Sequence, residues 1–328
     1  MAEEVAIGRI LVTGGGGFVG RYLLPRLRGD FPAAELHATR RGCGCDQAGV
    51  VWHRLDVRDG VAVTALVASL KPDVVIHLAA QSDVARSFEQ PAATWNINLD
   101  GALNLQRALA MTGRGVLVQV GSADMYGASF RAGVVDEQAL LQPLNPYAAS
   151  KAAADLAAYA LSQTSSVHVI RCRPFNHTGA GQSAAFVVSA FARQIAQAEN
   201  GLVPAVIKVG DLSGQRDFLH VSDVVAAYSA LVRCCHRIES GRAVNICSGE
   251  PVAISTVLAE LVGLSSIDFE VVVDSGRLRK SDIPQAVGRA DLLRSLTGWS
   301  RRVERLPMLA SVLGYWRDYY AAGRGEGE

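Results

Sequence analysis

The sequence lacks the features of a membrane-spanning or secreted protein. Its 328 residues contain no uncharged apolar run that approaches the roughly 18 residues needed to cross a bilayer. Residues 1–9 carry two glutamates and lead straight into a strand-like run, without the basic and then apolar plan of a secretory signal. We therefore expect a cytoplasmic protein with no membrane partner.

An excess of one charge is also missing, and so is a cysteine framework. The 32 Lys and Arg residues against 31 Asp and Glu residues leave a net charge of +1, which argues against holding nucleic acid by bulk charge. The six cysteines form no CxxC pair, and Cys43 and Cys45 have no partner ligands at zinc spacing. The sequence therefore predicts no metal site and suits a reducing compartment.

What the sequence does have is a regular alternation of strand and helix patterns in its first half. Apolar residues make up 49% of the chain, which is enough for a large core. Short Val/Ile-rich runs between helical patterns indicate a parallel sheet covered on both faces. We expect strands at 7–13, 35–39, 74–79, 116–120 and 167–172, and helices at 18–27, 61–70, 94–111 and 146–163. This order predicts an α/β protein of the doubly wound, Rossmann type.

After Pro174 the alternation loosens, which indicates a second and smaller lobe. We expect a cofactor-binding domain over residues 1–174 and a mixed α/β substrate lobe over residues 175–328, with some later segments returning to the first domain. No Pro/Ser-rich linker separates the halves, so both should belong to one unit. The later elements are expected as helices at 185–197, 221–234, 254–262 and 303–319, and as strands at 206–209, 244–247 and 269–273.

A glycine-rich turn joins the first expected strand to the first helix. Gly14, Gly17 and Gly20 stand three residues apart, as in a variant of the dinucleotide-binding fingerprint, and Phe18 and Val19 open the helix. In such a pattern the first glycine allows the tight turn, and the second lets backbone N–H groups approach a pyrophosphate. The third lets the helix pack close to the sheet. Because strand, turn and helix come in the required order, we predict dinucleotide binding here.

The end of the second expected strand bears on the choice of cofactor. An enzyme that prefers NAD usually places Asp or Glu here to accept from the ribose 2′-OH, whereas this chain has Arg40 and Arg41. Two guanidinium groups suit a 2′-phosphate, so the sequence favours NADP(H). Use of NAD(H) stays open, because solvated surface arginines are the alternative interpretation. Asp56 and Val57 follow the next apolar run, where we expect contact with the adenine, although a carboxylate there can also cap a helix.

Tyr147 and Lys151 form a YxxxK pair behind Pro146. Proline suits the first turn of a helix, so the two side chains are expected one turn apart on the same face. A lysine cation near a phenol lowers the pKa of the phenol and makes it a proton donor or acceptor near neutral pH. Ser122 comes just past the strand expected at 116–120, where its hydroxyl can bond the oxygen that Tyr147 protonates.

Together these motifs resemble the extended short-chain dehydrogenase/reductase family, which acts on nucleotide sugars, over nearly the whole chain. The resemblance implies that Tyr147 is the acid/base, that Lys151 binds the nicotinamide ribose and tunes Tyr147, and that Ser122 binds the substrate oxygen. The run 77–82 and the pair Asn98 and Gly101 are similar to the family's segments around the cofactor. They imply a substrate contact by Ser82 and cofactor contacts by Leu78, Ala79, Ala80 and Asn98.

The second half is similar to one group within this family, the GDP-4-keto-6-deoxy-D-mannose reductases. The sequence RPFNHTGAGQ resembles their signature, and further matches lie at 209–212, 216–218, 245–249 and 278–284. The resemblance implies a diphosphate held by Asn176, Arg216 and Arg279. It also implies that Asp282 accepts from the nucleotide ribose and that Val187 contacts the substrate. The chemistry agrees, because phosphates favour guanidinium groups and a diol favours a carboxylate.

Position 124 bears on the choice between reduction and dehydration. The related GDP-mannose 4,6-dehydratases use an extra acid/base near Ser122, usually a Glu two residues on, and this chain has the shorter Asp124, a further catalytic candidate. We therefore expect NAD(P)H-dependent reduction of the 4-keto group of a GDP-4-keto-6-deoxy-hexose, giving GDP-D-rhamnose from the 6-deoxy-mannose form. A GDP-mannose 4,6-dehydratase, another nucleotide-sugar epimerase or dehydratase, and a non-catalytic NADP-binding regulator stay open as alternatives.

The resemblance also implies a homodimer. In this family two long helices of each subunit commonly pack into a four-helix interface, and here these are the helices expected at 94–111 and 146–163. Their outer faces are rich in Ala and Leu, more than a solvated helix needs. The alternative is that the second lobe covers this face.

Overall fold

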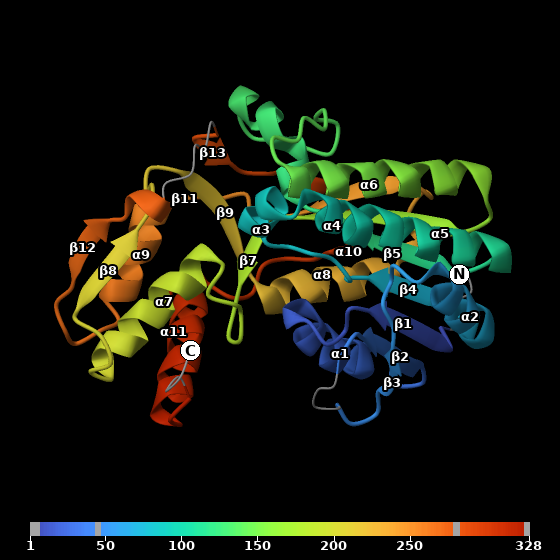
Figure 1. Ribbon diagram of the computed structural model, residues 1–328. Coiled ribbons are helices and arrows are strands. Elements are labelled where there is room, and N and C mark those ends of the chain that lie inside the picture. The colour runs from blue at the N-terminus through green and yellow to red at the C-terminus, as the bar shows by residue number, and fades with distance from the viewer. Residues whose placement is uncertain (1–6, 43–46, 278–282, 325–328) are drawn as a thin grey trace.

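Figure 1 shows the computed structural model of the chain, which describes residues 7–42, 47–277 and 283–324. A larger lobe is built around one sheet of seven strands, and a smaller lobe lies beside it. The strands of the large sheet are β1 (Arg9–Thr13), β2 (Glu35–Arg40), β3 (Val51–Arg54), β4 (Val74–His77), β5 (Val116–Val120), β6 (His168–Pro174) and β10 (Arg242–Ile246).

The seven strands are all parallel and follow the order β3-β2-β1-β4-β5-β6-β10. This is the doubly wound arrangement, so the predicted fold class is confirmed. The order reverses between β1 and β4, and open α/β sheets bind their ligands at such a switch point. The loops that follow these two strands are therefore the place to look for a site.

Helices cover both faces of the sheet, which explains why its strands read as continuous apolar runs. On one face α1 (Phe18–Asp30) and α8 (Val221–Arg233) pack against strand residues such as Ile10 and Val12. On the other face α2 (Gly60–Leu70), α5 (Gly101–Thr112) and α6 (Pro146–Thr164) pack around Leu11, Val75 and Leu117. Neighbouring residues of β1 thus belong to two different cores.

The smaller lobe has a core of its own, formed mainly by α7 (Val187–Glu199), α9 (Ile254–Val262) and α11 (Arg305–Ala321). Two short sheets accompany these helices. One pairs β8 (Val206–Val209) with β12 (Glu270–Val273), and the other contains β7 (Asn176–Thr178), β9 (Gln215–His220), β11 (Pro251–Ala253) and β13 (Gln285–Ala286). Helix α8 and strand β10, which also come from the second half of the chain, lie in the larger lobe.

The structure corrects the helix expected at 94–111. It begins earlier, at Pro91 in the first turn of α4 (Pro91–Trp95), passes through a π-helical segment, Asn96–Asp100, and continues as α5. A π-helical turn holds one residue more than an α-helical turn and is often found at functional sites. Here it contains Asn98, whose side chain is buried.

Several short elements carry no periodic sequence signal and were not expected. They are strands of two to six residues, often polar, and two helices of six and seven residues. They comprise β3, β7, β9, β11, β13, α3 (Val84–Glu89) and α10 (Asp291–Thr297). Among the helices in the described ranges, none has both the length and the apolar character needed to span a bilayer.

Candidate active site

The turn after β1 has a shape that only glycine allows. Gly14 has a φ of +71°, and a Cβ on it would stand 2.7 Å from the backbone of Ala79, in the loop after β4. A Cβ on Gly20 would stand 2.1 Å from the carbonyl oxygen of Gly15, so a side chain there would push α1 away from the turn. These contacts agree with the predicted roles of the two glycines.

The start of α1 is open to an anion. Gly17 precedes the helix, and among the described residues no side chain caps it by a hydrogen bond. The first N–H groups of the helix, at Phe18 and Val19, therefore point toward the turn without a side-chain acceptor. This is the arrangement in which helix N-termini bind phosphate. Gly16 and Gly17 are also exposed, so a dinucleotide pyrophosphate fits against this turn.

Hydrogen bonds hold the neighbouring strand ends around the turn. Thr13 Oγ1 lies 2.7 Å from Nδ1 of His77, which joins β1 to β4, and the N–H of Gly14 donates to Thr39 Oγ1 of β2 at 3.2 Å. The N–H of Leu78 donates to the Thr13 carbonyl at 3.1 Å. The predicted cofactor residues Leu78 to Ala80 therefore lie directly beside the glycine turn.

Arg40 lies at the end of β2, next to the same turn. Its Cβ lies 3.2 Å from the position that a Cβ on Gly16 would take, and its guanidinium lies 4.7 Å from the centroid of the Trp52 ring. Arg41 follows it and is exposed. Sequence reasoning missed Trp52. It sits opposite Ala38 in the β2–β3 register, a pairing that local patterns do not reveal.

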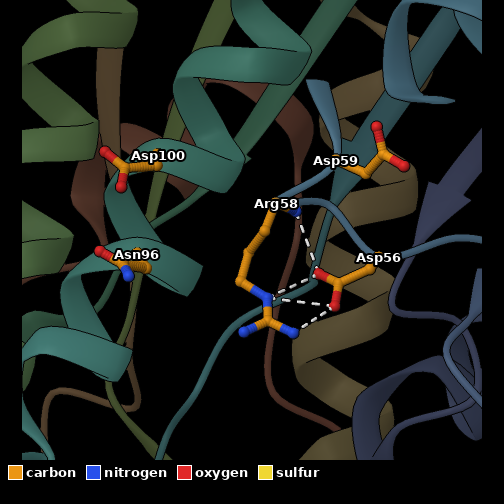
Figure 2. Close-up of a pocket in the computed structure, with 5 residues that line it drawn as sticks. All are labelled: Asp56, Arg58, Asp59, Asn96 and Asp100. Carbon is orange, nitrogen blue, oxygen red and sulfur yellow. Dashed lines mark hydrogen bonds and ion pairs between the residues drawn. The ribbon is translucent and has the colours of Figure 1, made fainter. Parts of the chain in front are cut away.

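Asp56 lies at a pocket that it shares with Arg58, Asp59, Asn96 and Asp100 (Figure 2). Arg58 donates to its carboxylate from Nε at 3.0 and 3.1 Å and from Nη2 at 2.5 Å. This ion pair is the main reason why the pKa of Asp56 falls to about 2. Its carboxylate is thus already engaged, and its expected contact with the adenine stays a prediction.

The side chains of Val57 and Asn98 are both buried. Val57 is buried, and a Cβ on Gly101 would come within 2.6 Å of its side chain. Asn98 accepts from the N–H of Gln81 at 2.8 Å and donates to the Gln81 carbonyl and to Ser150 Oγ, both at 3.0 Å. These bonds fix the loop after β4, which contains Leu78 to Ala80. Direct contacts of Val57 and Asn98 with a cofactor stay predictions.

Ser122, Tyr147 and Lys151 come together where β5 ends and α6 begins. Asn145 caps α6 by accepting from the N–H of Ala148 at 2.7 Å, with Pro146 in the first turn as expected. Lys151 Nζ donates to the carbonyl of Val120 at 2.5 Å, two residues before Ser122. The Ser122 hydroxyl lies near enough to the Tyr147 hydroxyl to lower its pKa. The fold therefore assembles the predicted acid–base group.

Burial controls how this group ionises, and here the sequence-based expectation is wrong. Desolvation raises the pKa of Tyr147 above its usual value, the nearby charge of Asp124 adds to the rise, and the Ser122 hydroxyl opposes it. Lys151 is not among the groups that shift Tyr147. Burial instead lowers the pKa of Lys151 itself to about 8, against the attraction of Asp155. Tyr147 thus holds its proton at neutral pH and is suited to donate it.

Asp124 and Arg216 bring the smaller lobe to this group. The N–H of Asp124 donates to Ser122 Oγ at 3.2 Å. Desolvation raises the pKa of the half-buried Asp124 carboxyl, and the charge of Arg216 offsets part of this rise. Arg216 belongs to β9, whose neighbour β7 contains the exposed Asn176, paired with Phe218 in the register. The predicted diphosphate residues Asn176 and Arg216 therefore lie on adjacent strands.

The other predicted substrate residues are Ser82, Val187, Arg279 and Asp282. Ser82 is exposed just before α3, and Val187 is the first residue of α7, where it packs half-buried against the core of the smaller lobe. Arg279 and Asp282 lie outside the described residues. Within the described ranges, no cluster of three or more His, Cys, Asp or Glu side chains could hold a metal ion.

An aromatic contact that sequence reasoning missed joins α1 to the segment after β6. The rings of Phe18 and His177 stack with centroids 6.4 Å apart and planes inclined by 8°. His177 Nδ1 lies 2.9 Å from the carbonyl of Phe175, and the Tyr22 hydroxyl donates to the carbonyl of Ala180 at 2.8 Å. The sequence did mark His177, which belongs to the RPFNHTGAGQ run, as part of a motif. Its contact with Phe18 on α1 could be found only in three dimensions.

Comparison with known proteins agrees with this site. The model of the NAD dependent epimerase/dehydratase family matches residues 10–247, and the chain belongs to this family of nicotinamide-dependent enzymes. Among curated relatives, GDP-6-deoxy-D-mannose reductase from Pseudomonas aeruginosa is 35% identical over 312 residues, which cover 94% of this chain and 97% of the relative. The predicted family resemblance is therefore confirmed.

Solved structures give the same result. The chain matches the structure of RMD from Pseudomonas aeruginosa complexed with NADPH with a TM-score of 0.81 and 33% identity, over 95% of this chain and 99% of that one. It matches the Thermus thermophilus UDP-glucose 4-epimerase complex with NAD with a TM-score of 0.82 and 26% identity, over 94% and 99% of the two chains. The family thus includes complexes with either nicotinamide cofactor.

The close packing at Gly20 predicts a selective loss of stability. Gly20→Ala should lower the free energy of unfolding by about 1–3 kcal/mol, because the new methyl group meets the Gly15 backbone. Gly29→Ala, in the same helix, is the control: its Cβ meets nothing within 4 Å, and it should gain up to about 1 kcal/mol from helix propensity. Urea unfolding of both variants measures the difference, and equal stabilities would contradict the packing argument.

Proposed function

We propose that the chain reduces the 4-keto group of a GDP-4-keto-6-deoxy-hexose with NADPH, most directly converting GDP-4-keto-6-deoxy-D-mannose to GDP-D-rhamnose. This activity would supply nucleotide sugar for polysaccharide biosynthesis in the cytoplasm. The observation that carries the proposal is the group of Ser122, Tyr147 and Lys151 at the sheet edge, with a buried tyrosine that keeps its proton. The 35% identity to GDP-6-deoxy-D-mannose reductase supports the choice of substrate.

The chain's own residues account for the proton chemistry of such a reduction. A nicotinamide cofactor held against the glycine turn supplies the hydride. Tyr147 donates its proton to the carbonyl oxygen of the sugar, and the hydroxyl of Ser122 donates a hydrogen bond to the same oxygen. The ketone thereby becomes a secondary alcohol. Lys151 is expected to bind the nicotinamide ribose, as the family resemblance implies.

Asp124 supports reduction over dehydration. Loss of water from the sugar needs a further acid/base beside Ser122, and Asp124 is one methylene shorter than the Glu that the dehydratases usually have there. Arg216 attracts its carboxylate from β9. The presence of both Tyr147 and Lys151 argues against a regulator that only binds the cofactor.

Incubation with GDP-4-keto-6-deoxy-D-mannose and NADPH tests the proposal. We expect nicotinamide absorbance to fall as GDP-linked deoxy sugar forms. Tyr147→Phe should cut turnover by at least about a hundredfold while it keeps cofactor binding, because only the proton donor is removed. If NADPH is not oxidised but GDP-mannose is converted to a keto-sugar, the chain is the dehydratase instead.

Cofactor preference is expected to depend on Arg40 and Arg41. If both guanidinium groups bind the 2′-phosphate of NADPH, the Arg40→Ala, Arg41→Ala double variant should weaken NADPH binding at least about tenfold and barely change NADH binding. Fluorescence titration with each cofactor measures the two constants, and added salt should reduce the difference if the contacts are exposed. Equal losses for both cofactors would show that the arginines only support the fold.

The exposed faces of the long helices are expected to form a dimer interface. Leu156 and Tyr159 of α6 are 56% and 45% exposed, and Met111 of α5 is 71% exposed. Burial of such side chains between two copies would stabilise a dimer. Light scattering at micromolar concentration should give twice the mass of one chain, and Leu156→Asp should give a monomer. Leu306→Asp is the control, because this leucine is 50% exposed on α11 of the smaller lobe. A monomeric unmodified protein would contradict the interface.

A further inference from the structure

Arg173 is the first residue of the RPFNHTGAGQ sequence, but its side chain is buried between β6 and α6. It donates to the carboxylate of Asp155 from Nη2 at 2.9 Å and from Nε at 3.4 Å, and Arg171 donates to the same carboxylate at 2.6 Å. Asp155 is 0% exposed and Arg173 is 4% exposed, so the ion pair is shielded from water. Asp155 stands four residues after Lys151 on α6. The pair therefore ties the helix that contains the catalytic lysine to the sheet.

Tyr126 extends this ion pair to the segment after β5. Arg173 Nη1 donates to the Tyr126 hydroxyl at 3.0 Å, and that hydroxyl donates to Asn245 Oδ1 of β10 at 2.7 Å. Burial raises the pKa of Tyr126 to about 12, so it keeps the proton that it donates. Tyr126 stands four residues after Ser122 and two after Asp124, in the 3₁₀-helical segment Ala123–Ala132. The bonds thus connect the Ser122 segment to α6 through β6.

We propose that Asp155, Arg173 and Tyr126 are positioning residues, which hold the Ser122 segment and the Tyr147 face of α6 in one fixed geometry. The inference rests on the function proposed above. Ser122 and Tyr147 must reach the same substrate oxygen, and they come from different elements. A buried ion pair and a neutral hydroxyl that join those elements fix the distance between them. Small displacements of reacting groups can cost a large part of the rate.

Asp155 also acts on Lys151 through its charge. Its attraction opposes the lowering of the Lys151 pKa that burial causes. His77 of β4 lies near enough to Lys151 for their charges to interact, but burial lowers the pKa of His77 to about 3, so it is neutral. Asp155 is thus the anion that favours the charged form of Lys151.

Tyr126→Phe tests the positioning role, because it removes one hydroxyl and keeps the ring. We expect kcat for the keto-sugar to fall about tenfold while KM for NADPH changes less than about twofold. Tyr320→Phe is the matched control: its buried hydroxyl accepts from Arg193 Nε at 2.8 Å in the smaller lobe. Both variants lose one arginine–tyrosine hydrogen bond, and Tyr126→Phe also loses the bond to Asn245, but only Tyr126→Phe should lose rate. A kcat for Tyr126→Phe equal to that of Tyr320→Phe overturns the proposal.

Hydrogen exchange gives a readout that needs no substrate. Amide exchange across 122–132 and 147–151 should be faster in Tyr126→Phe than in the unmodified protein, and unchanged in Tyr320→Phe. If the unmodified protein does not reduce the keto-sugar, the proposed function fails, and this measurement alone decides on the positioning role. Unchanged exchange in Tyr126→Phe then overturns it.

Asp155→Asn tests the effect of charge. Without the carboxylate the pKa of Lys151 should fall, so the alkaline limb of the kcat profile should move to lower pH, and Asp155→Glu should move it back. A folded Asp155→Asn variant with an unmoved limb excludes the effect on Lys151. If this variant does not fold, the Tyr126→Phe comparison still decides on the positioning role.

Discussion

The close approach of the glycine turn to the loop after β4 is the constraint on which the rest of the site depends. Gly14 lies so near Ala79 that no side chain fits between them. The Thr13–His77 hydrogen bond joins the ends of β1 and β4 directly before the turn and the loop. The turn and the loop border the switch point of the sheet. A ligand that binds along the turn can therefore extend over β4 and β5, toward Ser122 and Tyr147.

The ionisable groups at that end share one electrostatic setting. Desolvation raises the pKa values of Tyr147 and Asp124 and lowers that of Lys151, so each group is pushed toward its neutral form. Charged partners, Arg216 and Asp155, oppose the shifts of Asp124 and Lys151. Tyr147 and Asp124 are thereby favoured in their protonated forms, and a protonated Tyr147 is the state needed at the start of a ketone reduction. The oxidative direction would begin from a deprotonated phenol, which this setting disfavours.

The sequence predicted the parts of the site that depend on local spacing. The glycine turn, the YxxxK pair and Ser122 lie within or directly beside single elements, so periodicity and capping signals were enough to locate them. Contacts between distant segments escaped prediction: Tyr126 meets Asn245 across 119 residues, and Phe18 stacks on His177. The pKa of Tyr147 was predicted in the wrong direction because burial cannot be judged from residue spacing. Short polar strands such as β7 and β9 are formed by their partners and have no periodicity of their own.

The return of α8 and β10 to the larger lobe bears on how such an enzyme can change its substrate. β10 completes the edge of the large sheet beside β6, and α8 covers one of its faces together with α1. Both follow β7 and α7 in the chain and precede β11 and α9, so the backbone passes repeatedly between the two lobes. The smaller lobe is therefore not one continuous segment of the chain, and a single junction between two genes cannot exchange it as a whole.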